Sequence, residues 1–232
     1  MSNSTLTVTT ADGSFTAYVA QPAHTPVAAV VVMQEIFGVN AVMRGICDDL
    51  AGQGFLAVCP DLFWRIEPGI DISDKTEAEM KRAFELYGLF KVDTGVADAI
   101  ATLEAVKHHA LCNGKVGVLG FCLGGLLAAL MAFRSDSLAS VSYYGVGIEN
   151  VLAEASHLKH PLLMHIAGAD QFVPPAAQDT LLAAATASAL MEAHRYDGEG
   201  HAFARVGGHH YSQAAATLAN DRTTAFFKQH LG

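Results

Sequence analysis

The sequence predicts an α/β protein built on a mainly parallel sheet with helices on both faces, and three observations lead to this prediction. Short apolar runs alternate with segments of helical periodicity along almost the whole chain. One run, VAAVVVMQ (27–34), is apolar at nearly every position, which is typical of a strand buried on both faces. Near the N-terminus, Ala-Asp-Gly (11–13) separates two β-rich runs and indicates a hairpin.

The expected elements follow in a regular order. The hairpin strands LTVTT and FTAYVA form the antiparallel edge of the sheet. Six further strands are expected at 27–34, 55–60, 115–120, 138–145, 161–168 and 190–198. Helices are expected at 41–53, 76–89, 93–109, 174–189 and 209–230, with one more directly after the strand at 115–120. The segment 61–75 has weak periodicity and is expected to be a long surface loop. Eight strands without a linker predict a single domain over residues 1–232.

The composition narrows the class of protein. Of the 232 residues, 51% are hydrophobic and 16% are charged, which excludes disorder and allows a large buried core. The formal net charge of −9 argues against nucleic acid as a partner, and no basic cluster indicates a membrane patch. The polar N-terminus lacks the features of a signal peptide, and no apolar run is long enough to cross a bilayer. We expect a cytoplasmic protein.

The cysteines and histidines do not indicate a metal site. The four cysteines are far apart and form no Cys-x-x-Cys pair, as is typical of reduced thiols in a cytoplasmic protein; they are Cys47, Cys59, Cys112 and Cys122. The histidines at 108–109 and 209–210 are adjacent pairs, and adjacent side chains on a helix do not share a face. No bound metal is expected.

The clearest motif is Gly-Phe-Cys-Leu-Gly (120–124), which lies between an expected strand and an expected helix. It fits the nucleophile elbow of α/β-hydrolases with Cys122 in place of serine. The glycines allow the tight turn, and the helix N-terminus favours the thiolate form of the cysteine. Taken alone, the motif fits equally well a buried structural cysteine in a glycine-rich corner.

Two later residues favour the nucleophile. Asp170 follows the expected strand at 161–168, and His201 follows the expected strand at 190–198. The order nucleophile, acid, base is that of an α/β-hydrolase triad. His201 can accept the thiol proton and return it to the leaving group, while Asp170 fixes the histidine tautomer. The sequence therefore predicts Cys122, Asp170 and His201 as the catalytic residues of an α/β-hydrolase fold.

Gln-Glu-Ile-Phe-Gly (34–38) ends the buried strand at the same edge of the sheet. The backbone N–H groups of Ile36 and Leu123 are the expected oxyanion-hole donors. Glu35 directly follows the apolar strand, so we expect it to be partly buried near Cys122. Its alternative role is a salt bridge, for instance to Arg205, a cation expected near the pocket mouth that suits a substrate carboxylate. The two roles of Glu35 are compatible.

At this point the chain resembles the dienelactone hydrolase family. The matching pieces lie in family order over nearly the whole chain: QEIFGVNAVMR (34–44), AVCPDLF (57–63), GKVGVLGFCLGG (114–125), YYGVG (143–147), HPLLMHIAGADQFVP (160–174), GHAFAR (200–205) and LANDRT (218–223). The resemblance implies a single-domain α/β-hydrolase with a Cys-His-Asp triad and no cofactor. It also implies cleavage of the lactone ester of a carboxylate-bearing dienelactone.

By position, the resemblance implies further roles. Glu35 is similar to the family glutamate that holds the resting thiol and receives its proton when substrate binds. Arg205 matches one of two arginines that bind the substrate carboxylate, and Tyr144 matches a tyrosine near the site. Phe37, in the matching QEIFG segment, is a further candidate substrate contact.

One departure from the family pattern concerns the second arginine. Counting back without gaps, its place is taken by Met80, and its neighbouring tyrosine is replaced by Phe84. Lys81 and Arg82 are close in sequence, but on a helix they point elsewhere. A single cation would then face the substrate, so the pocket could prefer a less charged ester or lactone.

These inferences predict a hydrolase for a small-molecule ester or lactone, acting as a monomer through a cysteine acyl-enzyme. Within hydrolases, the alternative is a broader esterase or thioesterase. From another class, the alternative is a non-catalytic thiol sensor that keeps the elbow as a ligand pocket. The presence of Asp170 and His201 argues against the sensor, because a sensor thiol needs no orienting acid.

Overall fold

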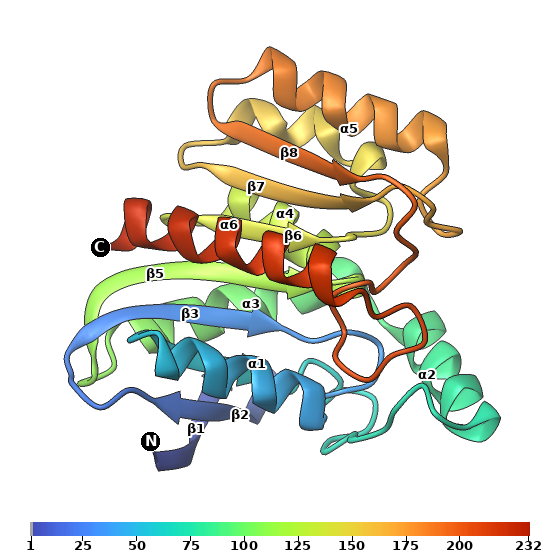
Figure 1. The fold of residues 1–232 in the computed structure, drawn as a ribbon. Coiled ribbons are helices and arrows are strands. Elements are labelled where there is room, and N and C mark those ends of the chain that lie inside the picture. The colour runs from blue at the N-terminus through green and yellow to red at the C-terminus, as the bar shows by residue number, and fades with distance from the viewer. Residues whose placement is uncertain (1) are drawn as a thin grey trace. The chain divides into compact units, whose positions relative to one another are not determined.

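The computed structural model describes residues 2–232, whose contacts divide the chain into two compact units, Met1–Gly117 and Val118–Gly232. The strands belong to an eight-stranded, mainly parallel sheet with helices around it, so the predicted fold class is confirmed (Figure 1). The prediction of a single domain stays a prediction.

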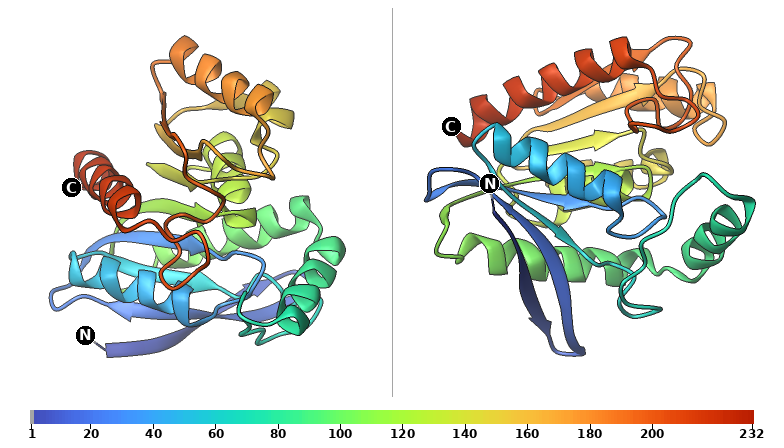
Figure 2. Two further views of the ribbon diagram at one scale, coloured as in Figure 1. Left: turned by 45° about the vertical axis from the view of Figure 1, so that its right-hand side comes forward. Right: turned by 60° about the horizontal axis from the view of Figure 1, so that its bottom comes forward.

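The first unit contains four complete strands in the order β1-β2-β4-β3: β1 (Ser2–Thr10), β2 (Gly13–Gln21), β3 (Val27–Met33) and β4 (Leu56–Pro60). β1 and β2 form the expected antiparallel hairpin, which is drawn in dark blue in Figure 2. β2 is also antiparallel to β4, whereas β3 and β4 are parallel. β3 is almost entirely buried, as its continuous apolar run predicts.

Three helices belong to the first unit: α1 (Ala41–Gly52), α2 (Glu77–Leu89) and α3 (Val92–Lys107). The side chain of Asn40 caps α1 by accepting a hydrogen bond from the backbone N–H of Met43 at 3.1 Å. α1 and α3 lie on opposite faces of the first unit's strands (Figure 1). α2 buries only Ala83 and Leu86.

The segment between β4 and α2 differs from the expected surface loop, because its beginning is buried. Leu62 and Phe63 are 2% and 0% exposed. The Asp61 carboxylate, itself buried, accepts hydrogen bonds from the backbone N–H groups of Phe63 at 3.0 Å and Gly69 at 2.7 Å. This local turn satisfies the backbone and lets the two apolar side chains reach the core.

The second unit contains parallel strands in the order β5-β6-β7-β8. β5 (Cys112–Phe121) enters it at Val118 and is followed by β6 (Ser140–Tyr143), β7 (Leu162–Ala167) and β8 (Met191–Tyr196). Because the strands are parallel, the loops that follow them gather at one edge of the sheet.

Helices cover both faces of the second unit's strands. They are α4 (Leu123–Arg134), α5 (Pro175–Ala187) and α6 (Gln213–Leu231). α4 and α6 lie on opposite faces of these strands (Figures 1 and 2). Two short 3₁₀ helices, η1 (Ile148–Asn150) and η2 (Leu152–His157), follow β6 and were not predicted. Over residues 2–232, no helix is both long enough and apolar enough to cross a membrane.

Candidate active site

Cys122 occupies a strained turn between β5 and α4. Its backbone has φ 56° and ψ −115°, a conformation that L-residues rarely adopt. A Cβ atom at Gly120 would lie 1.9 Å from the carbonyl oxygen of Gly124, and one at Gly125 would lie 2.7 Å from that of Tyr143. Both positions therefore exclude any larger residue. Cys122, at the tip of the turn, is only partly buried.

Asp170 and His201 form a buried pair in the second unit. His201 Nδ1 lies 2.8 Å from Asp170 Oδ2, and the two side chains are 7% and 0% exposed. The other carboxylate oxygen of Asp170 accepts a hydrogen bond from the backbone N–H of Phe172 at 2.8 Å. With the carboxylate fixed in this way, Nδ1 of His201 carries the proton and Nε2 is the nitrogen left for chemistry.

The electrostatics of His201 favour its protonated form. Burial by itself would lower the pKa of His201, but hydrogen bonds with Asp170 and Cys122 and the charges of these two groups raise it to about 10. Nε2 is buried, and because Nδ1 pairs with Asp170, Nε2 is the nitrogen that interacts with Cys122. Below this pKa the imidazole of His201 is protonated and can donate from Nε2.

Backbone hydrogen bonds join the loop that contains Asp170 to the loop that contains His201. The N–H of Gly168 donates to the carbonyl of Tyr196 at 2.9 Å, and the N–H of Ala169 donates to that of Glu199 at 2.8 Å. His210 also contributes, because its Nδ1 lies 3.1 Å from the carbonyl oxygen of His201 and donates to it. These contacts fix the positions of Asp170 and His201 together.

Aromatic rings surround His201. The ring of Tyr144 lies 5.2 Å from the imidazole at an interplanar angle of 62°, and the ring of Phe172 lies 4.8 Å away at 78°. Tyr144 itself has φ 38°, and its N–H donates to the carbonyl of His165 at 2.7 Å. The sequence singled out Tyr144 but missed Phe172, which is 42% exposed. Phe172 could have been identified from the sequence because it comes two residues after Asp170.

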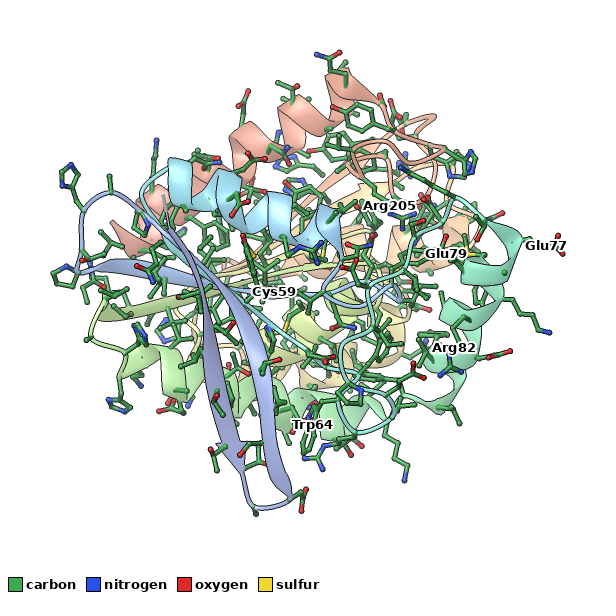
Figure 3. The ribbon with its side chains drawn as sticks, turned by 90° about the horizontal axis from the view of Figure 1, so that it is seen from below. Cys59, Trp64, Glu77, Glu79, Arg82 and Arg205 are labelled. Atoms are coloured by element: carbon green, nitrogen blue, oxygen red, sulfur yellow. The ribbon has the colours of Figure 1, made fainter. Side chains whose placement is uncertain are left out.

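Arg205 lies in the loop between His201 and α6, as Figure 3 shows. The loop is compact, since the N–H of Arg205 donates to the carbonyl of Ala202 at 2.9 Å and Arg205 accepts from Gly208 at 3.0 Å. Ala202 has φ 65° and begins this turn. Arg205 as a residue is half-buried and comes four residues after His201.

Three of the candidate residues follow β3 in the first unit. Glu35, Ile36 and Phe37 are 2%, 8% and 2% exposed, so the expected burial of Glu35 is observed. Gly38 closes this loop with φ 77°, and a Cβ there would lie 1.9 Å from the carbonyl oxygen of Ile70. The position of these residues relative to Cys122, including the oxyanion-hole role of Ile36 and Leu123, stays a prediction.

Met80 and Phe84 lie one turn apart on α2, so they share a face of the helix. Met80 is half-buried and Phe84 is 47% exposed. Arg82, labelled in Figure 3, forms ion pairs with Glu67 and Glu85, and Lys81 is exposed. Neither cation shares the face of Met80. The substrate roles of Met80 and Phe84 stay predictions.

A search for metal ligands gave no cluster of three or more His, Cys, Asp or Glu side chains within residues 2–232. The described geometry instead defines a class: an α/β-hydrolase fold in which a strand ends in a strained cysteine elbow and two later strands are followed by a paired aspartate and histidine.

Comparison with known proteins gives the family. The model of the dienelactone hydrolase family matches residues 15–231. A protein of Azospirillum brasilense, provisionally named a carboxymethylenebutenolidase, is 53% identical over 95% of this chain and 96% of its own length. The carboxymethylenebutenolidase of Pseudomonas putida is 41% identical over 92% of this chain and 90% of its own. A crystal structure described as a dienelactone hydrolase homologue, from Klebsiella pneumoniae, superposes with a TM-score of 0.86 at 27% identity and covers 98% of both chains.

The chain therefore belongs to the dienelactone hydrolase family, as the sequence motifs predicted. It is a carboxylic ester hydrolase. This assignment sets aside the non-catalytic thiol sensor.

Proposed function

We propose that the chain hydrolyses the ester bond of a small lactone, dienelactone (carboxymethylenebutenolide) or a close relative, through an acyl-enzyme on Cys122. The observation that supports this most directly is the buried 2.8 Å contact between Asp170 and His201 in the unit whose elbow presents Cys122. The names of the relatives point to the same substrate class.

In the acylation step, the Cys122 thiolate attacks the lactone carbonyl carbon and forms a tetrahedral intermediate. The oxyanion is held by the backbone N–H groups of Leu123 and Ile36. The intermediate collapses, the ring C–O bond breaks, and the leaving oxygen takes the proton from His201 Nε2. The products of this step are a thioester on Cys122 and a neutral imidazole.

The same electrostatics explain how His201 then changes role. Once the Cys122 thiolate has formed, its charge and its hydrogen bond both raise the pKa of His201. Both contributions vanish once the sulfur is acylated, so the pKa of His201 falls and the neutral imidazole can act as a base. It removes a proton from water, the hydroxide attacks the thioester, and the thiolate leaves with the pair of electrons from the C–S bond.

The substrate carboxylate is assigned to Arg205, with Glu35 as the group that holds the resting thiol and receives its proton. The half-buried position of Arg205 in the loop after His201 supports the first assignment. The burial of Glu35 to 2% exposure supports the second, because a buried carboxylate needs a partner or a proton.

A second candidate, a broader esterase or thioesterase, is favoured by one specific observation. The position of the family's second arginine is Met80, and the neighbouring Arg82 is occupied by Glu67 and Glu85. A site with one cation discriminates less strongly in favour of an anionic substrate. Comparing kcat/KM for dienelactone and for a neutral aryl ester of the same size separates the two candidates.

The catalytic role of Cys122 is tested by a pair of cysteine variants. We expect Cys122→Ala to lower kcat roughly 10⁴-fold or more, because the nucleophile is lost. Cys112→Ala is the matched control, since Cys112 is also partly exposed but lies at the opposite end of β5. It should retain the wild-type rate. Retention of activity in Cys122→Ala with an intact circular dichroism spectrum would overturn the mechanism.

We further propose that the enzyme works in the cytoplasm as a monomer. The four free thiols of the chain support a reducing compartment. Sedimentation of the purified protein would test the oligomeric state.

A further inference from the structure

Six polar side chains form a continuous hydrogen-bonded chain between α6 and the strands β6, β7 and β8. In order, the distances are Arg222 Nη1 to Tyr196 Oη 3.1 Å, Tyr196 Oη to His165 Nδ1 2.9 Å, His165 Nε2 to Thr223 Oγ1 2.9 Å, Thr223 Oγ1 to Tyr143 Oη 2.7 Å, and Tyr143 Oη to Asn220 Oδ1 2.9 Å. Figure 1 shows α6 crossing in front of β6. The middle of the chain is buried, with His165 and Tyr143 each 1% exposed.

The direction of every bond follows from one end. Tyr143 donates its only hydroxyl proton to the carbonyl oxygen of Asn220, so it must accept a proton from Thr223. Thr223 has then used its own proton and must accept from His165 Nε2. In a neutral imidazole Nδ1 is therefore bare, and it accepts the hydroxyl proton of Tyr196.

The other end agrees independently. Arg222 can only donate, so the oxygen of Tyr196 accepts from it and its proton stays free for His165. Burial holds the pKa of His165 well below its ordinary value, and the charges of His194 and Arg222 act in the same direction. His165 is thus the neutral Nε2–H tautomer that the chain requires.

The backbones of the same strand residues hold the active site. The carbonyl of Tyr143 accepts the N–H of Cys122 at 3.0 Å, and the carbonyl of His165 accepts the N–H of Tyr144 at 2.7 Å. The carbonyl of Tyr196 accepts the N–H of Gly168, two residues before Asp170, at 2.9 Å. Tyr143, His165 and Tyr196 are therefore linked to α6 through their side chains. Through their backbone carbonyls they hold the elbow, Tyr144 and the loop that contains Asp170.

We propose that this series of hydrogen bonds, centred on Thr223, lets α6 position the catalytic residues. Its members do not touch the reacting atoms. They act by fixing the carbonyl groups of Tyr143, His165 and Tyr196, and through them the distance between the Cys122 thiol and His201. The inference rests on the proposed function, because it assigns the positioned groups their catalytic roles.

The test uses two substitutions of Thr223 and a control. Thr223→Val keeps the shape but removes the hydroxyl, so kcat for a small activated ester should fall about 10- to 100-fold with KM changed less than about twofold. Thr223→Ser restores the hydroxyl and should return kcat to near the wild-type value. Thr102→Val is the matched control. Thr102 is also buried, but its hydroxyl donates to the backbone carbonyl of Asp98 on α3 and takes no part in the hydrogen bonds around Thr223. It should lower the melting temperature and leave kcat unchanged.

Two readouts need no ester. The first is the rate at which iodoacetamide alkylates Cys122, followed on the Cys122 peptide by mass spectrometry, which should fall in Thr223→Val and recover in Thr223→Ser. The second is the ¹⁵N spectrum of His165, which should show a pyrrole-like Nε2 and a pyridine-like Nδ1 that do not titrate between pH 5 and pH 9, values chosen to bracket the ordinary histidine pKa.

The outcomes are distinguishable. If Thr223→Val kept the wild-type kcat and alkylation rate and only its melting temperature fell, the hydrogen bonds around Thr223 would have a structural role and no positioning role. A protonated Nδ1 on His165 would overturn the direction of these hydrogen bonds. Failure of the wild type to turn over any ester would contradict the proposed function, and the alkylation and ¹⁵N results would still decide the positioning proposal.

Discussion

Two regions of the molecule differ in how many contacts fix them in place. One is the pair of loops that contain Asp170 and His201, and the other is the helix α2. The loops are buried and joined by backbone hydrogen bonds. Within the part of the chain that the structure describes, the non-glycine residues with positive φ are Cys122, Tyr144 and Ala202: the predicted nucleophile, a ring neighbour of His201 and the residue after His201. By contrast, α2 buries two side chains, exposes three large apolar ones and relies on surface ion pairs.

This difference predicts that substitutions in the two regions have different consequences. Strained backbone persists only where the surrounding contacts over-determine it, so the elbow and the histidine loop should tolerate little change. A surface helix with few buried contacts should tolerate substitution well. If the predicted substrate roles of Met80 and Phe84 hold, substitutions on α2 should change the substrate range and leave the fold intact.

The largest effect is expected from Asp170→Asn in the firmly held region. This change removes the charge that stabilises the imidazolium, so kcat should fall about 10³- to 10⁴-fold. The alkaline limb of the kcat/KM profile should lie near the His201 pKa of about 10 in the wild type and move to lower pH in the variant. An unchanged pH profile would show that Asp170 does not act on His201.

The same pair links stability to pH. The folded pKa of His201, about 10, lies above the ordinary value of 6.5, so between these values the native state binds more protons than the unfolded chain. The stabilisation is fully present below pH 6.5 and is lost as the pH rises through about 10. Urea unfolding of the wild type and of Asp170→Asn across this window should show the difference between them shrinking.

Gly120→Ala should be the next largest change. Its new Cβ would lie 1.9 Å from the carbonyl oxygen and 2.3 Å from the carbonyl carbon of Gly124, and backbone atoms cannot rotate away. We expect the free energy of unfolding to fall by about 3 kcal/mol or more. Denaturant titration measures this directly, and a loss below about 1 kcal/mol would mean that the elbow is not tightly constrained.

Met80→Arg tests the other region. It would place a second cation on the face of α2 shared with Phe84, and kcat/KM for dienelactone relative to a neutral aryl ester should rise about tenfold. Lys81→Arg is the control, because Lys81 is exposed on a different face and is already a cation. If Met80→Arg left the ratio unchanged, the account of the missing cation would be wrong.

The smallest effect is expected from Gly88→Ala near the end of α2. Nothing lies within 4 Å of the Cβ that this change adds. Replacing a helical glycine in open space should raise the free energy of unfolding by about 0.5–1 kcal/mol. Activity should not change. Destabilisation would indicate that α2 is more tightly packed than its exposed side chains suggest.

Much of the site could be predicted from the sequence because parallel strands bring their following loops to one edge. Cys122, Asp170 and His201 each follow an expected strand, so their grouping needed only the strand pattern. The expected strand at 138–145 was too long, since β6 ends at Tyr143 and the left-handed Tyr144 turns the chain away. Strand propensity does not report such a turn.

The series of hydrogen bonds through Thr223 could not be predicted. His165 and Tyr143 read as ordinary strand residues, and Thr223 as an ordinary helix residue, so their pairing depends on contacts across 58 and 80 positions of sequence. The burial of Leu62 and Phe63 was missed for a similar reason, because the turn that Asp61 stabilises interrupts any periodic pattern.

The central claim is that Cys122 becomes acylated, and intact-protein mass spectrometry during turnover of a slow activated ester tests it most directly. The account predicts that acid-quenched samples contain one acyl group per chain, located on the Cys122 peptide, and that Asp170→Asn slows both its formation and its loss. Full turnover with no adduct, or with the adduct on Cys112 instead, would contradict it.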